Sequence, residues 1–258
     1  METTRREILN QVASGTLTPV EAATRLDEAE RATAASPPTP EATGGSGLRG
    51  VRVSSTFGRI VVLGDAAVDQ ATAEGPCVAR REDDIFVIEG EPLSDDDFSF
   101  NRRTGGHWWN TFREQTVTVR MNPRLELWIT ADAGSVSVRE VLAPIHAEVQ
   151  AGSLSVQGFA GPLDLAASAG SIRGEGTLRE GSSRIRCEMG SVRITLAPDY
   201  DVAVSATAQM GKVKLEDSKE GGGGAWSFGQ RHDAVYGAGA ASLVIESQMG
   251  SVVVARSR

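Results

Sequence analysis

Aromatic and charged side chains gather in one stretch of the chain, residues 89–113, which reads EGEPLSDDDFSFNRRTGGHWWNTFR. Aromatic and arginine side chains contribute most of the binding energy at protein interfaces, and tryptophan rings also suit the flat faces of sugars. The alternative is a long β-hairpin whose rings pack back on the sheet while Asp and Arg neutralise each other. The candidate contact residues of a binding surface here are Phe98, Phe100, Arg102, Arg103, His107, Trp108 and Trp109.

Few residues elsewhere have the types and spacing that catalysis or metal binding requires. His146 and Glu148 are two positions apart and share one side of a strand, but two ligands fall short of a metal site. The acidic run 95–97 lacks the spacing of an EF-hand loop. The sequence also contains no nucleophile motif, P-loop or dinucleotide fingerprint. We therefore expect no enzyme activity, no metal and no cofactor.

The charge balance argues against nucleic acid as a partner. The chain has 34 acidic and 26 basic side chains, a net charge of −8, and no basic footprint for phosphates. No apolar run approaches the roughly 18 residues of a membrane span, and none near the N-terminus reads as a signal peptide. These features predict a cytoplasmic protein, with a surface location only through a non-standard export route.

The elements that must position these residues are marked by a recurring Gly-Ser-apolar motif. Its glycines stand at positions 58, 134, 152, 170, 190, 211 and 250. The central spacings of 18, 18, 20 and 21 residues give a period near 19, which is typical of a repeat architecture. Glycine accepts positive φ without penalty, and serine hydrogen-bonds its own turn, so the motif predicts a tight corner.

Apolar and polar residues alternate before and after each corner, as half-buried strands require. We therefore expect a mainly β fold, a repeat β-solenoid with two strands per unit around a narrow core. An antiparallel meander folded into a sandwich is the alternative. Cys187 aligns with Val149 and Ala167, so it is expected to be a buried, unreactive thiol.

Two further regions precede the repeats. Residues 1–31 predict a helical hairpin, with a helical stripe of Ile8, Leu9 and Val12 and a second helix that includes Leu26. A hairpin of this size is too small to be stable alone, so these four residues are expected to pair with a partner or a second copy. Residues 32–50 are rich in Pro, Gly and Ser and predict a flexible linker. The β-repeat domain then spans 51–258, with 89–113 as an insertion.

Two parts of the sequence resemble known families. The apolar spacing from Ile8 to Leu26, around Gly15 and Thr18, resembles the short helical module ahead of β-repeat proteins in bacterial envelope-stress systems. The Gly-Ser-Val repeats over roughly 125–258 resemble the putative-adhesin family of β-strand-repeat domains. The resemblance implies a β-repeat fold and no catalytic residues.

Together these features predict a non-catalytic scaffold or interaction protein, either adhesin-like or acting in envelope-stress regulation. A protein partner or self-association through the N-terminal hairpin is expected. One alternative is a carbohydrate-binding β-helix that uses Trp108 and Trp109. Outward strand positions such as Ser137, Arg139 and Arg173 are mostly Ser, Gln and Arg, so sugar cleavage by paired carboxylates is not expected. A self-polymerising cytoskeletal-type solenoid is the other alternative.

Overall fold

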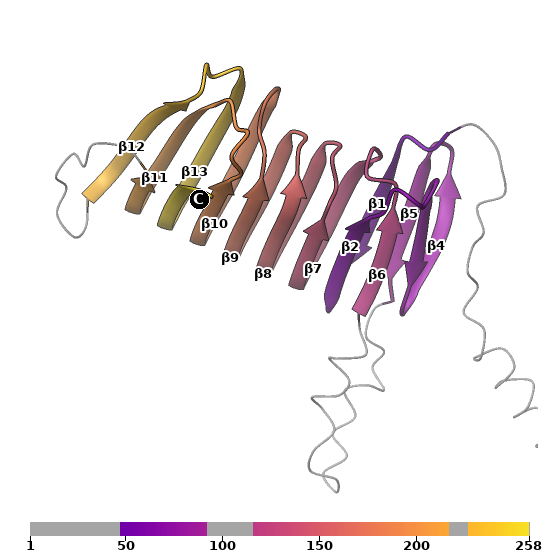
Figure 1. Ribbon diagram of the computed structural model, residues 1–258. Helices are drawn as coiled ribbons and strands as arrows, with labels where there is room; N and C mark the ends of the chain where they lie inside the picture. Colours follow the sequence, from indigo (N-terminus) through magenta and orange to yellow (C-terminus); the bar gives the residue numbers. More distant parts are fainter. Residues whose placement is uncertain (1–46, 92–115, 217–226, 258) are drawn as a thin grey trace, which may run out of the picture. The chain divides into compact units, whose positions relative to one another are not determined.

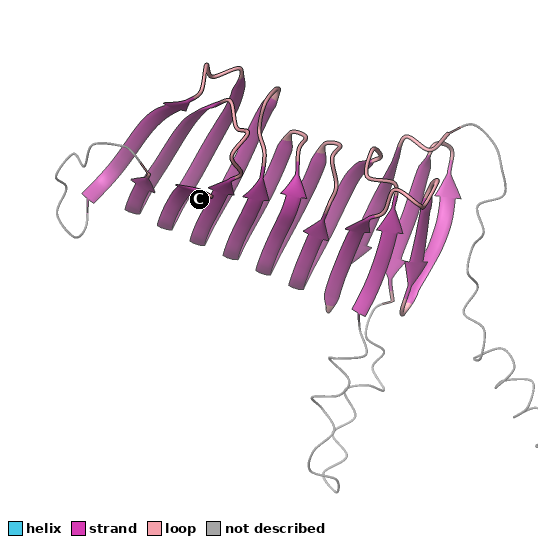
Figure 2. Cartoon of the chain, viewed as in Figure 1, coloured by secondary structure: helices cyan, strands magenta, loops and turns pink. Residues whose placement is uncertain are grey.

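The computed structural model describes residues 47–91, 116–216 and 227–257 of this chain. All of them belong to the compact unit Glu41–Arg258. The described residues form strands and loops with no helix (Figure 2). The predicted helical hairpin, with Ile8, Leu9, Val12 and Leu26, lies outside the described residues. The boundaries predicted for the domains stay a prediction.

Thirteen strands join in one hydrogen-bonded sheet (Figure 1). The six strands before the long repeats have four to six residues each. They are β1 (Gly50–Ser55), β2 (Arg59–Gly64), β3 (Ala71–Glu74), β4 (Cys77–Glu82), β5 (Ile85–Gly90) and β6 (Thr116–Met121). The remaining strands are β7 (Glu126–Arg139), β8 (Ile145–Phe159), β9 (Leu163–Gly176), β10 (Ser182–Leu196), β11 (Val202–Leu215), β12 (Ser227–Tyr236) and β13 (Ala241–Arg256).

The predicted repeat β-solenoid with two strands per unit is wrong. The Gly-Ser corner does not separate two strands, because β7 to β11 and β13 each run through it as a single strand of 14 to 16 residues. These strands belong to one mixed sheet. The antiparallel meander is also wrong, since the ladders that join these six strands are all parallel. Antiparallel ladders join β11 to β12, β3 to β6 and β4 to β5.

The corner glycines stack directly on one another across the sheet. Gly152 pairs in register with Gly134 and Gly170, and each has a φ between +133° and +145°. A Cβ atom added to any of these three would clash with the backbone of the preceding glycine in the stack. The sequence motif therefore reflects two demands on one position, a left-handed backbone and room for the neighbouring peptide.

The pattern of burial changes phase at each corner. In β8, Ile145 and Val149 are buried before the glycine at odd positions, whereas Leu154 and Val156 are buried after it at even positions. Both sets belong to one hydrophobic cluster. Since no helix covers the sheet within the described residues, the two halves of each bent strand must bury each other's apolar side chains. We call them the leading half, before the glycine, and the trailing half, after it.

The spatial order of the strands differs from their order in the sequence. The last strand, β13, lies between β10 and β11 and pairs in parallel with both. Gly58 lies next to Gly134, although 76 residues separate them, because β1 pairs with the leading half of β7 and β2 with its trailing half. One period of sequence therefore separates neighbouring strands only from β7 to β10, whereas Gly190 and Gly211 keep the spacing although β13 lies between their strands.

Cys187 occupies the predicted core position and is 1% exposed, which confirms the prediction of a buried thiol. It pairs in register with Ala167 on β9 and with Ser247 on β13. Burial, and to a lesser degree the charge of Glu188, raises the pKa of this thiol above its ordinary value.

Substitution of a stacked glycine should disrupt the sheet. Gly170→Ala places a Cβ against the Gly152 carbonyl and strains a residue with φ of +145°, so we expect a loss of more than about 3 kcal/mol in the free energy of unfolding. The matched control is Gly229→Ala, at φ of +69° with no atom within 4 Å, where only about 1 kcal/mol of backbone strain is expected. Urea denaturation of both variants measures the difference, and equal losses would contradict a role for stacking.

The stability of the protein should depend on the Cys187 thiol at high pH. Because the folded pKa is raised, the unfolded chain ionises first as the pH rises through the ordinary thiol value of 9.0, and folding loses stability there. The Cys187→Ala variant should show a smaller loss between pH 8 and 10. Urea midpoints across that range measure it, and identical pH profiles for the two proteins would refute the assignment.

Candidate interaction surfaces

Outward side chains stack in rows across the sheet, since the long strands are parallel and in register. Neighbouring members of a row are about 4.8 Å apart, the spacing of paired strands. The leading halves of β7 to β11 and β13, with β1, present one outward face, which we call the leading face. The trailing halves of the same strands, with β2, present the trailing face. Both faces lie on the outer side of the core that the two halves share.

The leading face is mainly acidic, with three basic and six acidic side chains at its outward strand positions. The basic members are Arg52, Arg184 and Arg186, and the acidic members are Glu126, Asp132, Glu148, Asp164, Glu188 and Glu246.

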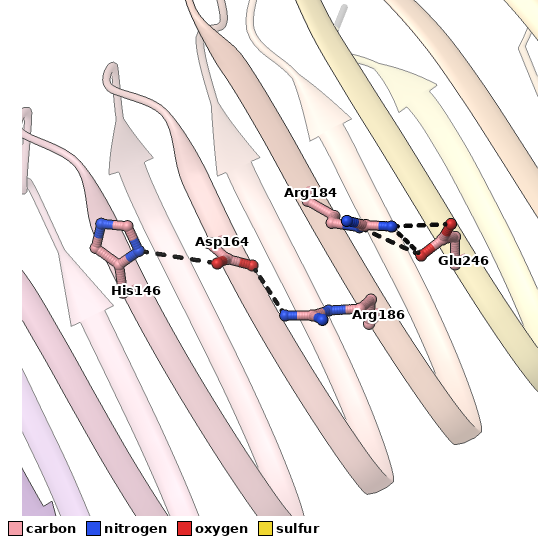
Figure 3. A network of polar contacts seen from close by, with 5 residues as sticks. All are labelled: His146, Asp164, Arg184, Arg186 and Glu246. Atoms are coloured by element: carbon pink, nitrogen blue, oxygen red, sulfur yellow. Dashed lines mark hydrogen bonds and ion pairs between the residues drawn. The ribbon is translucent and has the colours of Figure 1, made fainter.

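Several of these charges form a network of polar contacts (Figure 3). His146 Nε2 lies 3.1 Å from Glu126 Oε1, and His146 Nδ1 lies 3.9 Å from Asp164 Oδ2. Arg186 Nη2 lies 3.5 Å from the same Asp164 carboxylate, on its other oxygen. The His146 ring also stacks on Trp128, with centroids 6.0 Å apart and an interplanar angle of 11°. The network therefore holds the Trp128 and His146 rings in place on the leading face.

The same network shows which side chains contact His146, which the sequence places on one side of a strand with Glu148. Both lie on the leading face, as their spacing predicted, but the partners of His146 are Glu126 and Asp164 from the flanking strands. Within residues 47–91, 116–216 and 227–257, no group of three or more His, Cys, Asp or Glu side chains is arranged to hold a metal ion.

The trailing face is basic, with six basic side chains and one acidic side chain at its outward strand positions. Its first row is a ladder of five serine residues with a cation at each end. Arg59 precedes the ladder on β2 and Lys212 follows it on β11. The serines are Ser135, Ser153, Ser171, Ser191 and Ser251. The other charged members of the face are Arg139, Arg173, Arg193, Lys214 and Glu175.

Among the described residues, two of the three leading-face arginines have an ion-pair partner, whereas the trailing-face arginines have none. Arg184 and Arg186 on the leading face each form an ion pair with a carboxylate. On the trailing face, Arg139, Arg173 and Arg193 are exposed, and none of them has an ion pair with another described residue. Arg173 and Arg193 are direct register partners on β9 and β10, so two like charges lie side by side. Such pairs destabilise a sheet.

Exposed apolar side chains form a short row along the corner itself. Met189, Met249 and Met210 precede the glycines of β10, β13 and β11 and are in register with one another. Each is between 43% and 50% exposed. On β9 and β8 the same row continues with Ala169 and Ala151. Alanine is smaller than methionine, so the exposed apolar surface is narrower there.

The residues predicted as a binding surface are not placed by the structure. Phe98, Phe100, Arg102, Arg103, His107, Trp108 and Trp109 lie outside the described residues, in the segment 92–115 between β5 and β6. Sequence reasoning identified Ser137, Arg139 and Arg173 as outward positions but missed that they gather with Lys212 and Lys214 on one face. The sequence already held this pattern, because serine or a basic residue recurs at the second and fourth positions of most motifs when the glycine is counted as the first.

Comparison with known proteins gives no family model and no curated protein that matches this chain. Two solved structures are similar to it. A "putative cell adhesion protein" from Clostridium sporogenes shares 13% identity, with 82% of this chain and 94% of that one covered, at a TM-score of 0.45. A "putative adhesin" from Bacteroides fragilis shares 11% identity, with 81% and 93% covered, at a TM-score of 0.35.

Both TM-scores are below 0.5, so neither structure establishes the fold of this chain. The predicted resemblance to adhesin-type β-repeat proteins is matched by the names of these two structures, while no match supports the helical module predicted over Ile8 to Leu26. In the described part of the chain, no helix has the length and apolar character that crossing a membrane requires.

The ion pairs of the leading face should add little stability. Arg184 and Glu246 are 55% and 46% exposed, so we expect a coupling energy of about 0.2 to 1 kcal/mol between them. A double-mutant cycle with Arg184→Ala and Glu246→Ala, measured by urea denaturation, tests this value. A coupling above about 2 kcal/mol would show that the network has a structural role that its exposure does not predict.

Proposed function

We propose that this chain is a non-catalytic, adhesin-like interaction protein, which holds an extended partner on the outward faces of its sheet. The observation that carries the proposal is the segregation of charge between the two faces. Six basic side chains and one acidic side chain occupy the trailing face, whereas three basic and six acidic ones occupy the leading face. Folding alone does not favour this arrangement, since mixed charges on each face would reduce repulsion within the sheet.

The polar clusters of the described residues support binding rather than catalysis. The His146 network is a set of surface contacts in which His146 lies against Glu126 and Asp164, and Asp164 pairs with Arg186. Its side chains are 23% to 53% exposed, so water screens the charges that a catalytic site needs to concentrate.

End-to-end polymerisation receives no support from the strands at the two ends of the main strand order. β4 and β12 are antiparallel to their neighbours β5 and β11, while the strands between β5 and β11 are parallel. A second copy that continued the parallel ladder would have to displace these strands. A role in envelope-stress regulation stays a prediction of the sequence.

The proposal predicts retention of a partner without turnover. The full chain, immobilised on a biosensor, is exposed in turn to intact bacterial cells, to the same chain in solution and to an array of polysaccharides. We expect at least one partner to be retained, more weakly in 0.5 M than in 0.05 M NaCl, because salt screens exposed charges. An unrelated β-protein of equal net charge is the control.

Two results would overturn the proposed function. One is retention no greater than that of the control protein for every partner tested. The other is formation of a new product from any retained partner, such as new reducing ends from a polysaccharide, since a binding protein leaves its partner unchanged.

A further inference from the structure

The trailing face combines a ladder of serine hydroxyls with cations that form no ion pair with another described residue. Ser135, Ser153, Ser171, Ser191 and Ser251 follow one another strand by strand. From Arg59 on β2 to Lys212 on β11 the row crosses seven strands, a span of about 29 Å at the spacing of paired strands. Such a row presents evenly spaced hydrogen-bonding groups to a linear molecule laid across the strands.

A second row of the same face adds charge beside the ladder. Arg173 and Arg193 are direct register partners, two residues beyond Ser171 and Ser191 on the same side of their strands. Lys212 and Lys214 are likewise two residues apart on β11, and both are exposed. The cost of placing like charges together would fall if an anionic group lay between them.

We infer that the trailing face binds an acidic polysaccharide, whose hydroxyl groups meet the serine ladder and whose anionic groups meet Arg173, Arg193, Lys212 and Lys214. This inference rests on the proposed function, for which it names the ligand class. Arginine favours carboxylate and sulfate groups because its planar fork donates two parallel hydrogen bonds to them. Serine hydroxyls both donate and accept, so they suit sugar hydroxyls.

Two other polyanions fit this face less well. Single-stranded nucleic acids are held by aromatic platforms, and no outward strand position of the trailing face is aromatic. Anionic membranes are bound by basic surfaces that also insert large apolar side chains, whereas the outward apolar residues here are the half-buried Val61, Leu63, Val253 and Ala255. Both serve as comparison ligands in the test.

The test uses the full chain and defined polymers. Polygalacturonate carries carboxylates, dextran sulfate carries sulfates and plain dextran is neutral. Comparison of the three shows whether the protein binds carboxylates, sulfates or the sugar backbone itself. Binding is measured by titration calorimetry at low salt and repeated at several salt concentrations. We expect polygalacturonate, dextran sulfate or both to bind, with an affinity that falls as salt rises, and plain dextran not to bind.

Matched variants locate the site. Arg173→Ser with Arg193→Ser gives these positions the residue that β7 and β8 carry in the same row, at Ser137 and Ser155, so the fold should be retained. We expect at least a tenfold loss of affinity. Arg184→Ser with Arg186→Ser removes the same number of charges from the leading face, and less than a twofold change is expected.

Thermal unfolding gives a second readout. The Arg173→Ser, Arg193→Ser variant should unfold at an equal or higher temperature than the natural chain, because a repulsive pair is removed. The acidic polymer that binds should raise the unfolding temperature of the natural chain and raise that of this variant less.

Several results would overturn the inference. They are equal losses of affinity in the two double variants, binding of plain dextran, failure of both acidic polymers to bind, and tighter binding of single-stranded DNA or phosphatidylserine vesicles. If these occur while the natural chain still retains cells or a second copy on the biosensor, the ligand class fails and the proposed function stands.

Discussion

The contact between stacked glycine backbones is the constraint on which the rest of this structure depends. At Gly134, Gly152 and Gly170, each glycine takes a positive φ and lies so close to the next that no side chain fits between them. This contact fixes the parallel register, because a shift by one residue would place a Cβ atom in the stack. The same positions bend each strand and change the phase of its buried residues.

The surface follows from that register. Once glycine stands beside glycine, the next residue stands beside its equivalents, so serines form a ladder and Arg173 meets Arg193. A register fixed by backbone contact tolerates unfavourable neighbours on the outward side. The trailing face can therefore keep cations side by side. In a less constrained sheet the strands could shift their register, and the like charges would then no longer be neighbours. We attribute the proposed binding role to this separation between residues that hold the fold and residues that are free to contact a partner.

Much of the local structure was predictable from the sequence. The glycine positions, the alternation around them and the buried place of Cys187 all follow from local rules of backbone and burial. The spatial order of the strands could not be predicted. The repeats have nearly the same sequence pattern, so the pattern does not show that β13 pairs with β10 and β11 rather than with another strand. The corner was also misread as a break, since a bend inside a strand and a turn between two strands have the same Gly-Ser signature. The trailing face was missed because its cations come from separate repeats that only the register brings together.

Cross-linking of β10 to its neighbours tests this account most directly. In a chain with Cys77→Ala and Cys187→Ala, the pair Ser191→Cys and Ser251→Cys occupies register partners on β10 and β13, about 4.8 Å apart, within the Cα separation of a disulfide. The pair Ser191→Cys and Lys212→Cys is two strands apart, at about 9.6 Å, beyond that separation. We predict that mild oxidation cross-links the first pair and not the second. A cross-link in the second pair but not in the first would mean that β11 lies directly beside β10, and it would contradict the strand order described here, in which β13 lies between them.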